Sequence, residues 1–306
     1  MIVVAGEALV DLVIDPVGEV TRAFGGGPYN TARTLGRLGS HVAYFGAVSL
    51  DRFGSLMFRQ LEDDGVDTSL VQRSELPTSL AAAELDASGS ASYRFYFQET
   101  AAPNVQAQAL PRGVEALHLG TLGLVVEPMA SVLEALVLEL APEVLVVVDI
   151  NCRPSVITDH HGYIQRLRRV LARTDVVKVS TEDLEYLDLA GDVRKSADAL
   201  LQLGAQVVLH TDGGEAVHVH TAQRHRAISV TPVKVVDTIG AGDAFGGAFL
   251  AWWSQSGLQR AELHDLALLA KACEAAVVVS GVTCTRVGAD PPTAHELGDR
   301  WSPSQS

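Results

Sequence analysis

The chain has 306 residues, of which 47% are hydrophobic and 20% charged, and its formal net charge is −14. This length and composition predict a globular protein with an ample core, as one large domain or a domain with a small appendage. Because the net charge is acidic, we expect no basic face that could bind nucleic acid. The chain has no run of about 18 uncharged apolar residues, so we expect no membrane span.

The start of the chain and its cysteines favour a cytoplasmic location. Residues Met1–Gly6 look like a first strand and lack the basic segment that opens a signal peptide. Cys152, Cys273 and Cys284 lie far apart without metal-ligand spacing, so we expect reduced, mostly buried thiols.

Short apolar runs alternate with helical stretches along most of the chain. The further expected strands are Val42–Ala47, Ala116–Leu119, Val144–Asp149, Val176–Val179 and Val207–His210. The expected helices are Gly54–Asp63, Pro128–Leu140, Tyr163–Ala172, Thr181–Leu189, Val193–Leu203 and Ala261–Val279. This alternation predicts an α/β fold in which helices cover both faces of a mostly parallel sheet.

Residues 77–99 follow a different pattern. Thr78–Asp86 and Ser92–Phe97 flank Ala87–Ser90, which predicts a β-hairpin. Together with Leu12–Ile14 and Val20–Phe24, this hairpin predicts a small sheet that projects from the main body.

Polar residues and glycines follow the first strand. Asp11 ends the run Gly6–Asp11, near the sheet edge where open α/β proteins bind ligands, and its carboxylate can accept two hydrogen bonds from vicinal hydroxyls. Glu7 is a weaker candidate, because it can be oriented away from such a site. Gly25–Gly27 let backbone N–H groups face a ligand, and Asn30 either bonds that ligand or caps the following helix.

A second polar run, Asp149–Arg153, follows a fully apolar strand. Its alternate residues Asp149, Asn151 and Arg153 are expected on one side of an extended segment, either at a substrate site or as a hydrogen-bonded strand end. The alternating aromatics of Tyr93–Phe97 indicate sheet packing or, for Phe97, a substrate contact.

Two later strands also end in polar turns. Ser180, Glu182 and Asp183 open a helix and either cap it or serve a phosphate site. Thr211 and Gly213 lie in the turn after the next strand. The histidines of the hairpin beyond it, at positions 218, 220 and 225, are expected to be exposed, with a metal site as the alternative reading.

Residues 237–247, D-T-I-G-A-G-D-A-F-G-G, are the most informative stretch. Gly240, Ala241 and Gly242 are expected at a helix N-terminus, where unpaired N–H groups favour an anion. Asp243 is then a helix-capping acid or a base beside an oxyanion. No G-x-x-x-x-G-K-[ST] occurs, which excludes a P-loop enzyme, and a missing G-x-G-x-x-G weakens a dinucleotide-binding reading.

Residues 237–243 resemble the D-T-x-G-A-G-D signature of the ribokinase-like (PfkB) family of sugar kinases. Residues 25–39 resemble that family's G-G-x-x-x-N-x-A-x-x-x-x-x-L-G, and the resemblance extends from Gly6 to Pro292. It implies one kinase domain over residues 1–306, a three-layer fold and a β-sheet lid, formed by about residues 12–24 and 77–99, that covers the sugar and joins a homodimer.

The resemblance also implies roles for single residues. Asp243 would take the proton of a sugar hydroxyl that attacks the γ-phosphate of ATP, and Gly240, Ala241 and Gly242 would hold the transferred charge. The implied sugar contacts are Asp11, Gly26, Gly27, Asn30, Phe97, Asn151 and Arg153, and the implied nucleotide contacts are Ser180, Asp183, Thr211, Gly213 and Gly242. Mg²⁺ would be served through water by Asp183 or Glu182, and K⁺ by Asp237 and the Ile239 carbonyl.

Several of these motifs look most like fructokinases. Gly27-Pro28 replaces the glycine-lysine of ribokinases, and Gly6–Asp11 and Asp149–Arg153 also resemble fructokinases. Fructose is therefore the expected substrate, with 2-keto-3-deoxygluconate or another ketose or riboside as the alternative. A non-catalytic sugar-binding regulator is the remote alternative.

Overall fold

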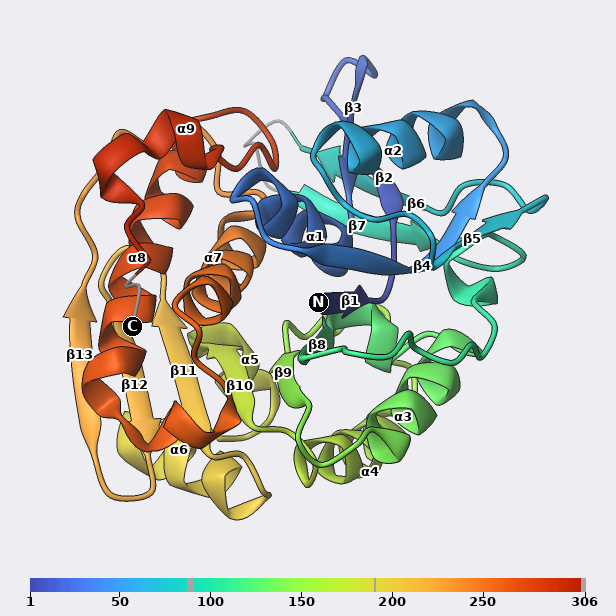
Figure 1. The fold of residues 1–306 in the computed structure, drawn as a ribbon. Coiled ribbons are helices and arrows are strands. Elements are labelled where there is room, and N and C mark those ends of the chain that lie inside the picture. Colours follow the sequence, from blue (N-terminus) through green and yellow to red (C-terminus); the bar gives the residue numbers. More distant parts are fainter. Residues whose placement is uncertain (87–90, 190, 304–306) are drawn as a thin grey trace.

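The described residues of this computed structural model, 1–86, 91–189 and 191–303, form a nine-stranded sheet and a separate four-stranded sheet (Figure 1). The strand order of the large sheet is β13-β12-β11-β10-β9-β8-β1-β4-β5. Its strands are β1 (Ile2–Ala5), β4 (Val42–Ser49), β5 (Val71–Ser74), β8 (Ala116–Gly120), β9 (Leu145–Asp149), β10 (Val176–Ser180), β11 (Val207–Asp212), β12 (Ala216–Thr221) and β13 (His225–Ser229). Neighbouring strands in this sheet pair in parallel, except that β12 pairs antiparallel with both β11 and β13 at one edge.

Helices cover both faces of this sheet, which confirms the predicted fold class. Ile2 and Val4 of β1 pack in one core cluster, with α1 (Gly27–Arg37), α2 (Arg52–Asp63), α7 (Ala241–Gln255) and α8 (Leu266–Cys284). Val3 and Ala5 point the other way, into a cluster with α3 (Met129–Glu139), α4 (His160–Leu171), α5 (Thr181–Tyr186) and α6 (Val193–Gln202). The apolar strands are thus buried on both sides, as parallel strands require.

The order of the strands reverses at β1. The chain passes from β1 to β4 and β5 on one side, and then returns to β8 and continues outward to β11 on the other. Open α/β sheets bind ligands in the crevice at such a switch point, beyond the carboxyl ends of the strands. The polar runs after β1, β8, β9 and β10 therefore face one region.

The small sheet has the strand order β3-β2-β6-β7 and lies beside α1 and α2 (Figure 1). Its strands are β2 (Leu9–Ile14), β3 (Val20–Gly25), β6 (Leu80–Leu85) and β7 (Ala91–Tyr96). A parallel β2–β6 pair joins the two predicted segments, which are far apart in sequence. The predicted turn at 87–90 lies outside the described residues.

One predicted helix, Ala261–Val279, was wrong in its bounds. The segment begins as the 3₁₀ turn η3 (Arg260–His264), and α8 starts afresh at Leu266 and runs on to Cys284. The break falls at Asp265, whose backbone is extended and whose side chain accepts hydrogen bonds from Ala267 N and Leu268 N. An acid that caps a new helix ends the turn before it.

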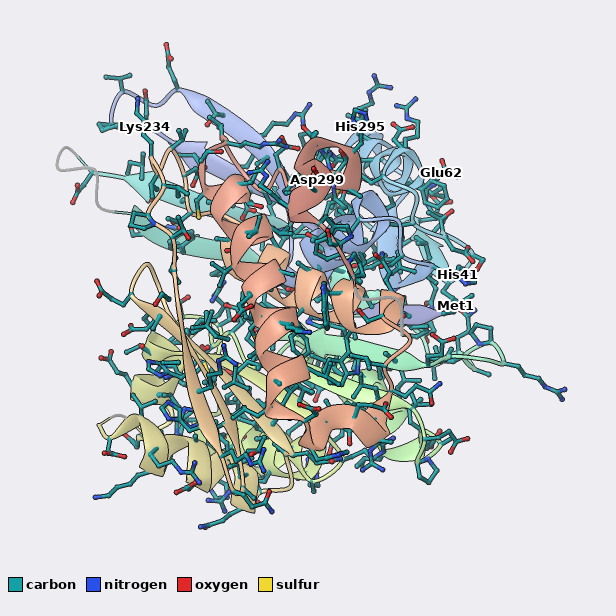
Figure 2. The ribbon with its side chains drawn as sticks, turned by 60° about the vertical axis from the view of Figure 1, so that its left-hand side comes forward. Met1, His41, Glu62, Lys234, His295 and Asp299 are labelled. Carbon is teal, nitrogen blue, oxygen red and sulfur yellow. The ribbon has the colours of Figure 1, made fainter. Side chains whose placement is uncertain are left out.

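Helix α8 is the one described helix that is long and apolar enough to span a membrane by length and composition alone. In this fold it packs against α7 and the outer strands β12 and β13, and Figure 2 shows it running across the face of the large sheet. Its apolar side therefore forms part of the core. The remaining described helices are α9 (Ala294–Leu297) and the 3₁₀ turns η1 (Ala102–Asn104), η2 (Thr121–Leu124) and η4 (Gly298–Arg300).

Candidate active site

Helix α7 begins at the predicted glycine turn. Gly240 is its N-cap residue, with a left-handed φ of 74°, and no side chain among the described residues caps the helix. A Cβ added to Gly240 would lie 2.5 Å from Ala289 Cβ and 3.0 Å from Ala289 Cα. The turn therefore requires glycine. Ala241 N donates to the Thr238 carbonyl at 3.2 Å, so of the two amides predicted to hold an anion in this first turn, Gly242 N is the one left available.

Asp243 lies in the first turn of α7 and is held by α1. Asn30 Nδ2 donates a 2.9 Å hydrogen bond to Asp243 Oδ2, and Thr31 Oγ1 donates to the Asp243 carbonyl. Burial raises the pKa of Asp243 to about 6, while the bond from Asn30 lowers it and the charge of Asp149 raises it. Asp243 is therefore a buried, oriented carboxylate that titrates within reach of neutral pH, as a general base requires.

The glycine turn before α1 is tied to the body of the protein by Glu7. Its Oε1 accepts from Gly27 N and its Oε2 accepts from Gly123 N, each at 3.1 Å. Glu7 is fully buried, and burial raises its pKa to about 8. Glu7 thus holds the turn and η2 in place, a role that no pattern near Glu7 in the sequence indicated.

Three polar side chains converge on Gly27. A Cβ at Gly27 would lie 2.6 Å from Thr121 Oγ1, 3.2 Å from Asp243 Oδ1 and 3.5 Å from Asn151 Nδ2. Thr121 follows β8 and was not among the predicted site residues. Only glycine leaves this space open, so the region above Gly27 can receive a small polar ligand.

Asp11, on β2, faces the same region. Its Oδ2 lies where a Cβ of Gly25 would be, at 2.1 Å. Burial raises the pKa of Asp11 to about 6, the charge of Asp243 raises it further and that of Arg153 lowers it. The structure thus brings Asp11 into electrostatic range of Asp243 and Arg153 from a separate sheet.

The run after β9 differs from the predicted extended segment. Strand β9 ends at Asp149, and Asn151 has a left-handed φ of 39°, so residues 149–153 do not continue as a strand. Asn151 Oδ1 accepts from Arg153 Nη1 at 2.6 Å, and its Nδ2 donates to Thr121 Oγ1 at 3.2 Å. Asparagine tolerates this conformation better than most residues, and here it aims its amide toward Gly27.

A buried ion pair supports the site from below. Lys178 Nζ lies 2.8 Å from Asp149 Oδ2, and both side chains are buried. Burial lowers the pKa of Lys178, but the charge and hydrogen bond of Asp149, together with the charges of Asp183 and Asp243, outweigh it and the pKa is raised. A Cβ on Gly242 would lie 3.2 Å from Lys178 Nζ, so this cation sits beneath the first turn of α7.

A largely apolar cavity of about 420 Å³ lies between the outer hairpin and helices α7 and α8. Three of the predicted nucleotide residues, Thr211, Gly213 and Gly242, line it. The other lining residues include Val217, Val230, Val233, Val235, Phe245, Val277 and Ser280, which the sequence did not single out. We call this cavity the nucleotide groove, after the nucleotide contacts that the sequence predicts in it, and it meets the Asp243 region at Gly242.

Ser180 and Asp183 form a capping box at the start of α5. Ser180 Oγ accepts from Asp183 N at 3.1 Å, and Asp183 Oδ2 accepts from Ser180 N at 2.8 Å. Asp183 Oδ1 also accepts from Cys152 N at 2.6 Å. Asp183 is buried in these contacts, whereas the neighbouring Glu182 is exposed.

Asp237 joins the two late loops. Its Oδ1 accepts from Ile239 N at 3.0 Å and its Oδ2 accepts from Gly288 N at 2.8 Å.

Phe97, from the predicted lid edge, packs near Leu9 and Leu122 and lines a separate cavity of about 390 Å³ with Tyr93–Tyr96, Ser155 and Val156.

Residues 1–295 match the pfkB family carbohydrate kinase. The chain belongs to this family. It is 35% identical over 258 residues to a fructokinase of Rhizobium leguminosarum bv. trifolii, across 82% of this chain and 79% of that protein. The predicted family and the predicted class of enzyme, a phosphotransferase with an alcohol acceptor, are thereby confirmed.

Solved structures of pfkB kinases agree with the fold. The fructokinase of Xylella fastidiosa with bound ATP has a TM-score of 0.86 and 30% identity, and the match covers 94% of this chain and 93% of that one. A double mutant of the fructokinase of Vibrio cholerae O395, with bound fructose, ADP and potassium ion, has a TM-score of 0.83 and 27% identity, over 94% and 93%.

Replacing Gly240 by alanine is expected to destabilise the kinase more than the same change at Gly39. Both glycines have left-handed φ, of 74° and 81°, so each alanine carries a strain of about 1–2 kcal/mol. Only the Cβ at position 240 also collides, with Ala289, because nothing lies within 4 Å of a Cβ at Gly39. Thermal unfolding of both variants tests this, and an equal loss of Tm would contradict it.

Proposed function

We propose that this carbohydrate kinase transfers the γ-phosphoryl group of ATP to a primary hydroxyl of fructose. The observation that carries the proposal is Asp243, hydrogen-bonded by Asn30 at the uncapped start of α7 and facing the open space above Gly27. The similar proteins named above are fructokinases, one of them with fructose and ADP bound.

In this mechanism, fructose lies above Gly27, between the small sheet and α7. Asp11, Asn30 and Asn151 bond its hydroxyls, and the backbone of Gly26 and Gly27 forms the floor. Asp243 accepts the proton of the attacking hydroxyl, because its raised pKa leaves it ionised at neutral pH yet basic enough to take a proton.

The developing phosphoryl charge is stabilised by the first turn of α7. Gly242 N would donate to that charge, whereas Ala241 N already donates to the Thr238 carbonyl at 3.2 Å, and the helix dipole adds to the effect of Gly242. Lys178 contributes positive charge beneath the same turn, although its pairing with Asp149 offsets part of it. Positioning and electrostatics of this kind supply most of the catalysis in phosphoryl transfer.

ATP is expected to lie in the nucleotide groove, with its base against the apolar wall and Thr211 and Gly213 near it. Mg²⁺, held through water by a carboxylate of this chain, would neutralise charge on its phosphates. Of the two candidate carboxylates, we favour Glu182 as the one that reaches the ion through water. Asp183 already binds Cys152 N and Ser180 N, while Glu182 is exposed.

A potassium ion is proposed between the two late loops. Asp237 bridges those loops, and each of its oxygens accepts one hydrogen bond from a backbone N–H group and retains a further lone pair. With the Ile239 carbonyl, it offers hard oxygen ligands of the kind that such a cation takes.

The small sheet is proposed to close over the sugar and to pair with a second copy of the chain. It carries exposed apolar side chains, Val20, Tyr93 and Tyr96, which are 52–56% exposed in the single chain. Both tyrosines lie on the edge strand β7, and burying their rings against a second chain would favour such pairing. We also propose a cytoplasmic location, which suits three free cysteines, two of them buried.

Substrate choice is tested by coupled ADP release with fructose, ribose, adenosine and 2-keto-3-deoxygluconate assayed side by side. Arg153 is the feature that favours the sugar acid, because a guanidinium pairs well with a carboxylate. Its Nη1 is already bonded to Asn151 Oδ1 and the Cys152 carbonyl, so we expect fructose to be preferred. A kcat/KM about tenfold higher for another acceptor would overturn fructose and leave the kinase assignment intact.

The pH profile of kcat/KM is expected to show an acid limb near pH 6. Asp243 must be ionised to act as a base, and Asp11 must be ionised to hold the sugar most strongly; the pKa of each is raised to about 6. Activity is therefore lost as the pH falls through this value, with a logarithmic slope between one and two. Asp11→Asn should bring the slope toward one. A profile that is flat from roughly pH 5 to 7 would contradict both assignments.

A further inference from the structure

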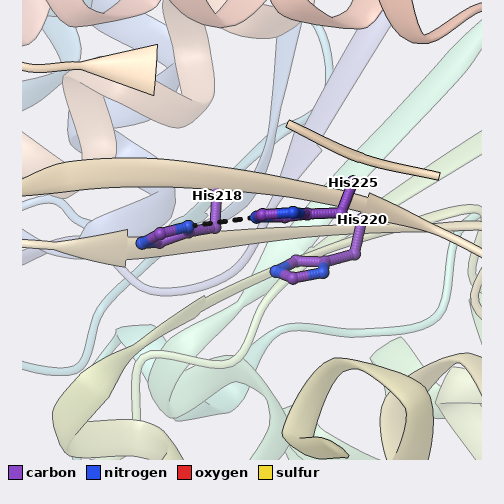
Figure 3. A group of neighbouring side chains, drawn as sticks. All are labelled: His218, His220 and His225. Carbon is purple, nitrogen blue, oxygen red and sulfur yellow. Dashed lines mark hydrogen bonds between the residues drawn. The ribbon is translucent and has the colours of Figure 1, made fainter. Parts of the chain in front are cut away.

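The outer hairpin of the large sheet gathers imidazoles on one of its faces (Figure 3). His220 on β12 lies directly opposite His225 on β13, and His218 shares its face because it is two residues away. We call these three residues the histidine cluster. Val217 and Val219, which alternate with them, point toward α7 and α8, so the cluster lies on the face toward α6, away from the nucleotide groove.

The ring nitrogens of the cluster are close enough to share one ion. One ligand nitrogen from each residue lies within 4.8 Å of the others, and His218 Nδ1 is 3.4 Å from His225 Nε2. Tetrahedral bonds of about 2.0–2.1 Å to zinc place two nitrogens about 3.3–3.4 Å apart. The rings of His220 and His225 stack at 4.6 Å, so binding requires a ring to turn about χ2, which is a soft torsion.

His220 is the residue that points most strongly to a ligand. The expectation of exposed histidines was wrong here, because His220 is 1% exposed, and neither of its ring nitrogens has a hydrogen-bond partner among the described residues. A buried polar group without a partner is costly to the fold. A metal ion would give one of these nitrogens the partner that it lacks.

The surroundings favour a transition metal over Mg²⁺ or Ca²⁺. The cluster found among the described residues contains imidazoles alone, a donor set that suits zinc, nickel and copper, whereas hard cations take oxygen ligands. Arg194 on α6 faces His220, but its guanidinium is held by Asp198 and the Ala222 carbonyl. His210, opposite His218 on β11, continues the row and is bonded to Thr181 Oγ1.

We propose that His218, His220 and His225 bind one divalent transition-metal ion, with Zn²⁺ as the type case, and that water completes its coordination. The ion would join β12 to β13 and fasten the outer edge of the large sheet. This site is independent of the proposed sugar kinase reaction, since it lies on the opposite face of the hairpin from the nucleotide groove.

The test is calorimetric titration of the full-length, untagged chain with zinc chloride in a non-coordinating buffer. We expect one site per chain and a rise in Tm with zinc, since an ion that binds only the folded state stabilises it. Magnesium or calcium chloride should produce neither effect. Cobalt(II) should give the visible absorption of a four-coordinate ion. A chain that takes up no zinc at about 100 µM overturns the proposal.

Single substitutions assign the ligands. His225→Gln and His218→Gln are each expected to weaken zinc binding by at least about tenfold, since loss of even an indirect contact to a bound metal costs that much. His41→Gln is the matched control: His41 is exposed, far from the hairpin and beside Met1 (Figure 2). An unchanged kcat in a zinc-free assay shows that each variant is folded. Zinc affinity that survives both cluster substitutions places the ion elsewhere and overturns the proposal.

Discussion

Asp243→Asn is expected to lower kcat by about 10²–10⁴-fold while sugar and ATP still bind. The amide is nearly isosteric with the carboxylate, so Asn30 and Thr31 remain in place around it. It cannot accept the proton of the attacking hydroxyl, however, and the loss therefore falls on the chemical step. Steady-state kinetics with fructose, together with calorimetric binding of each substrate, measure both halves of this prediction.

Asp63→Asn provides the matched control. Asp63 is an exposed acid at the end of α2, and its change to asparagine alters net charge by the same amount. Its kcat should equal that of the parent chain. If a folded, binding-competent Asp243→Asn variant keeps nearly full kcat, Asp243 is a helix-capping acid and not the base.

Asp11→Ala is expected to act on sugar binding and to leave the KM for ATP little changed. Asp11 lies in the small sheet against Gly25, across the site from the nucleotide groove. A hydrogen bond to a charged group contributes about 1.5–3 kcal/mol, so the KM for fructose should rise by about 10–150-fold. The Asp11→Asn side chain keeps one acceptor oxygen, so its KM for fructose should lie between those of the parent chain and of Asp11→Ala.

Glu84→Ala separates this effect from a general loosening of the small sheet. Glu84 lies on β6 in the same sheet and forms an exposed ion pair with Arg94. Its loss should leave both KM values unchanged, since exposed pairs contribute little. An Asp11→Ala variant with an unchanged KM for fructose would show that Asp11 does not touch the sugar.

The polar side chains that surround Asp243 illustrate what could be predicted and what could not. Asp11, Asn30 and Asn151 each stand in a recognisable sequence motif, and the structure places all three around Asp243 and Gly27, with Asp11 inside β2 rather than at the end of the first strand. Thr121 and Lys178 were not predicted as members of the site, and Glu7 was only a weaker candidate. Their roles depend on partners such as Gly123, Asn151 and Asp149, which lie 29 or more residues away.

The hairpin histidines make the same point in another way. Their alternation correctly indicated strands, but it did not reveal that His220 would be buried. Its burial depends on β11 and α6, which pack around β12. Alternation shows which residues share a face, and only the neighbouring elements decide whether that face meets water.

The sequence by itself determined the α/β class, the helix start at Gly240–Asp243 and the sugar kinase family. The first two follow from local causes, hydrophobic periodicity and glycines in a turn that only glycine can form, and the family follows from the resemblance of residues 25–39 and 237–243 to its signatures. The tertiary structure alone decided the order of the strands, the tie from Glu7 to both loops, the ion pair beneath α7 and the histidine cluster. Each of these joins groups that the chain separates, and such contacts depend on how whole elements pack against one another.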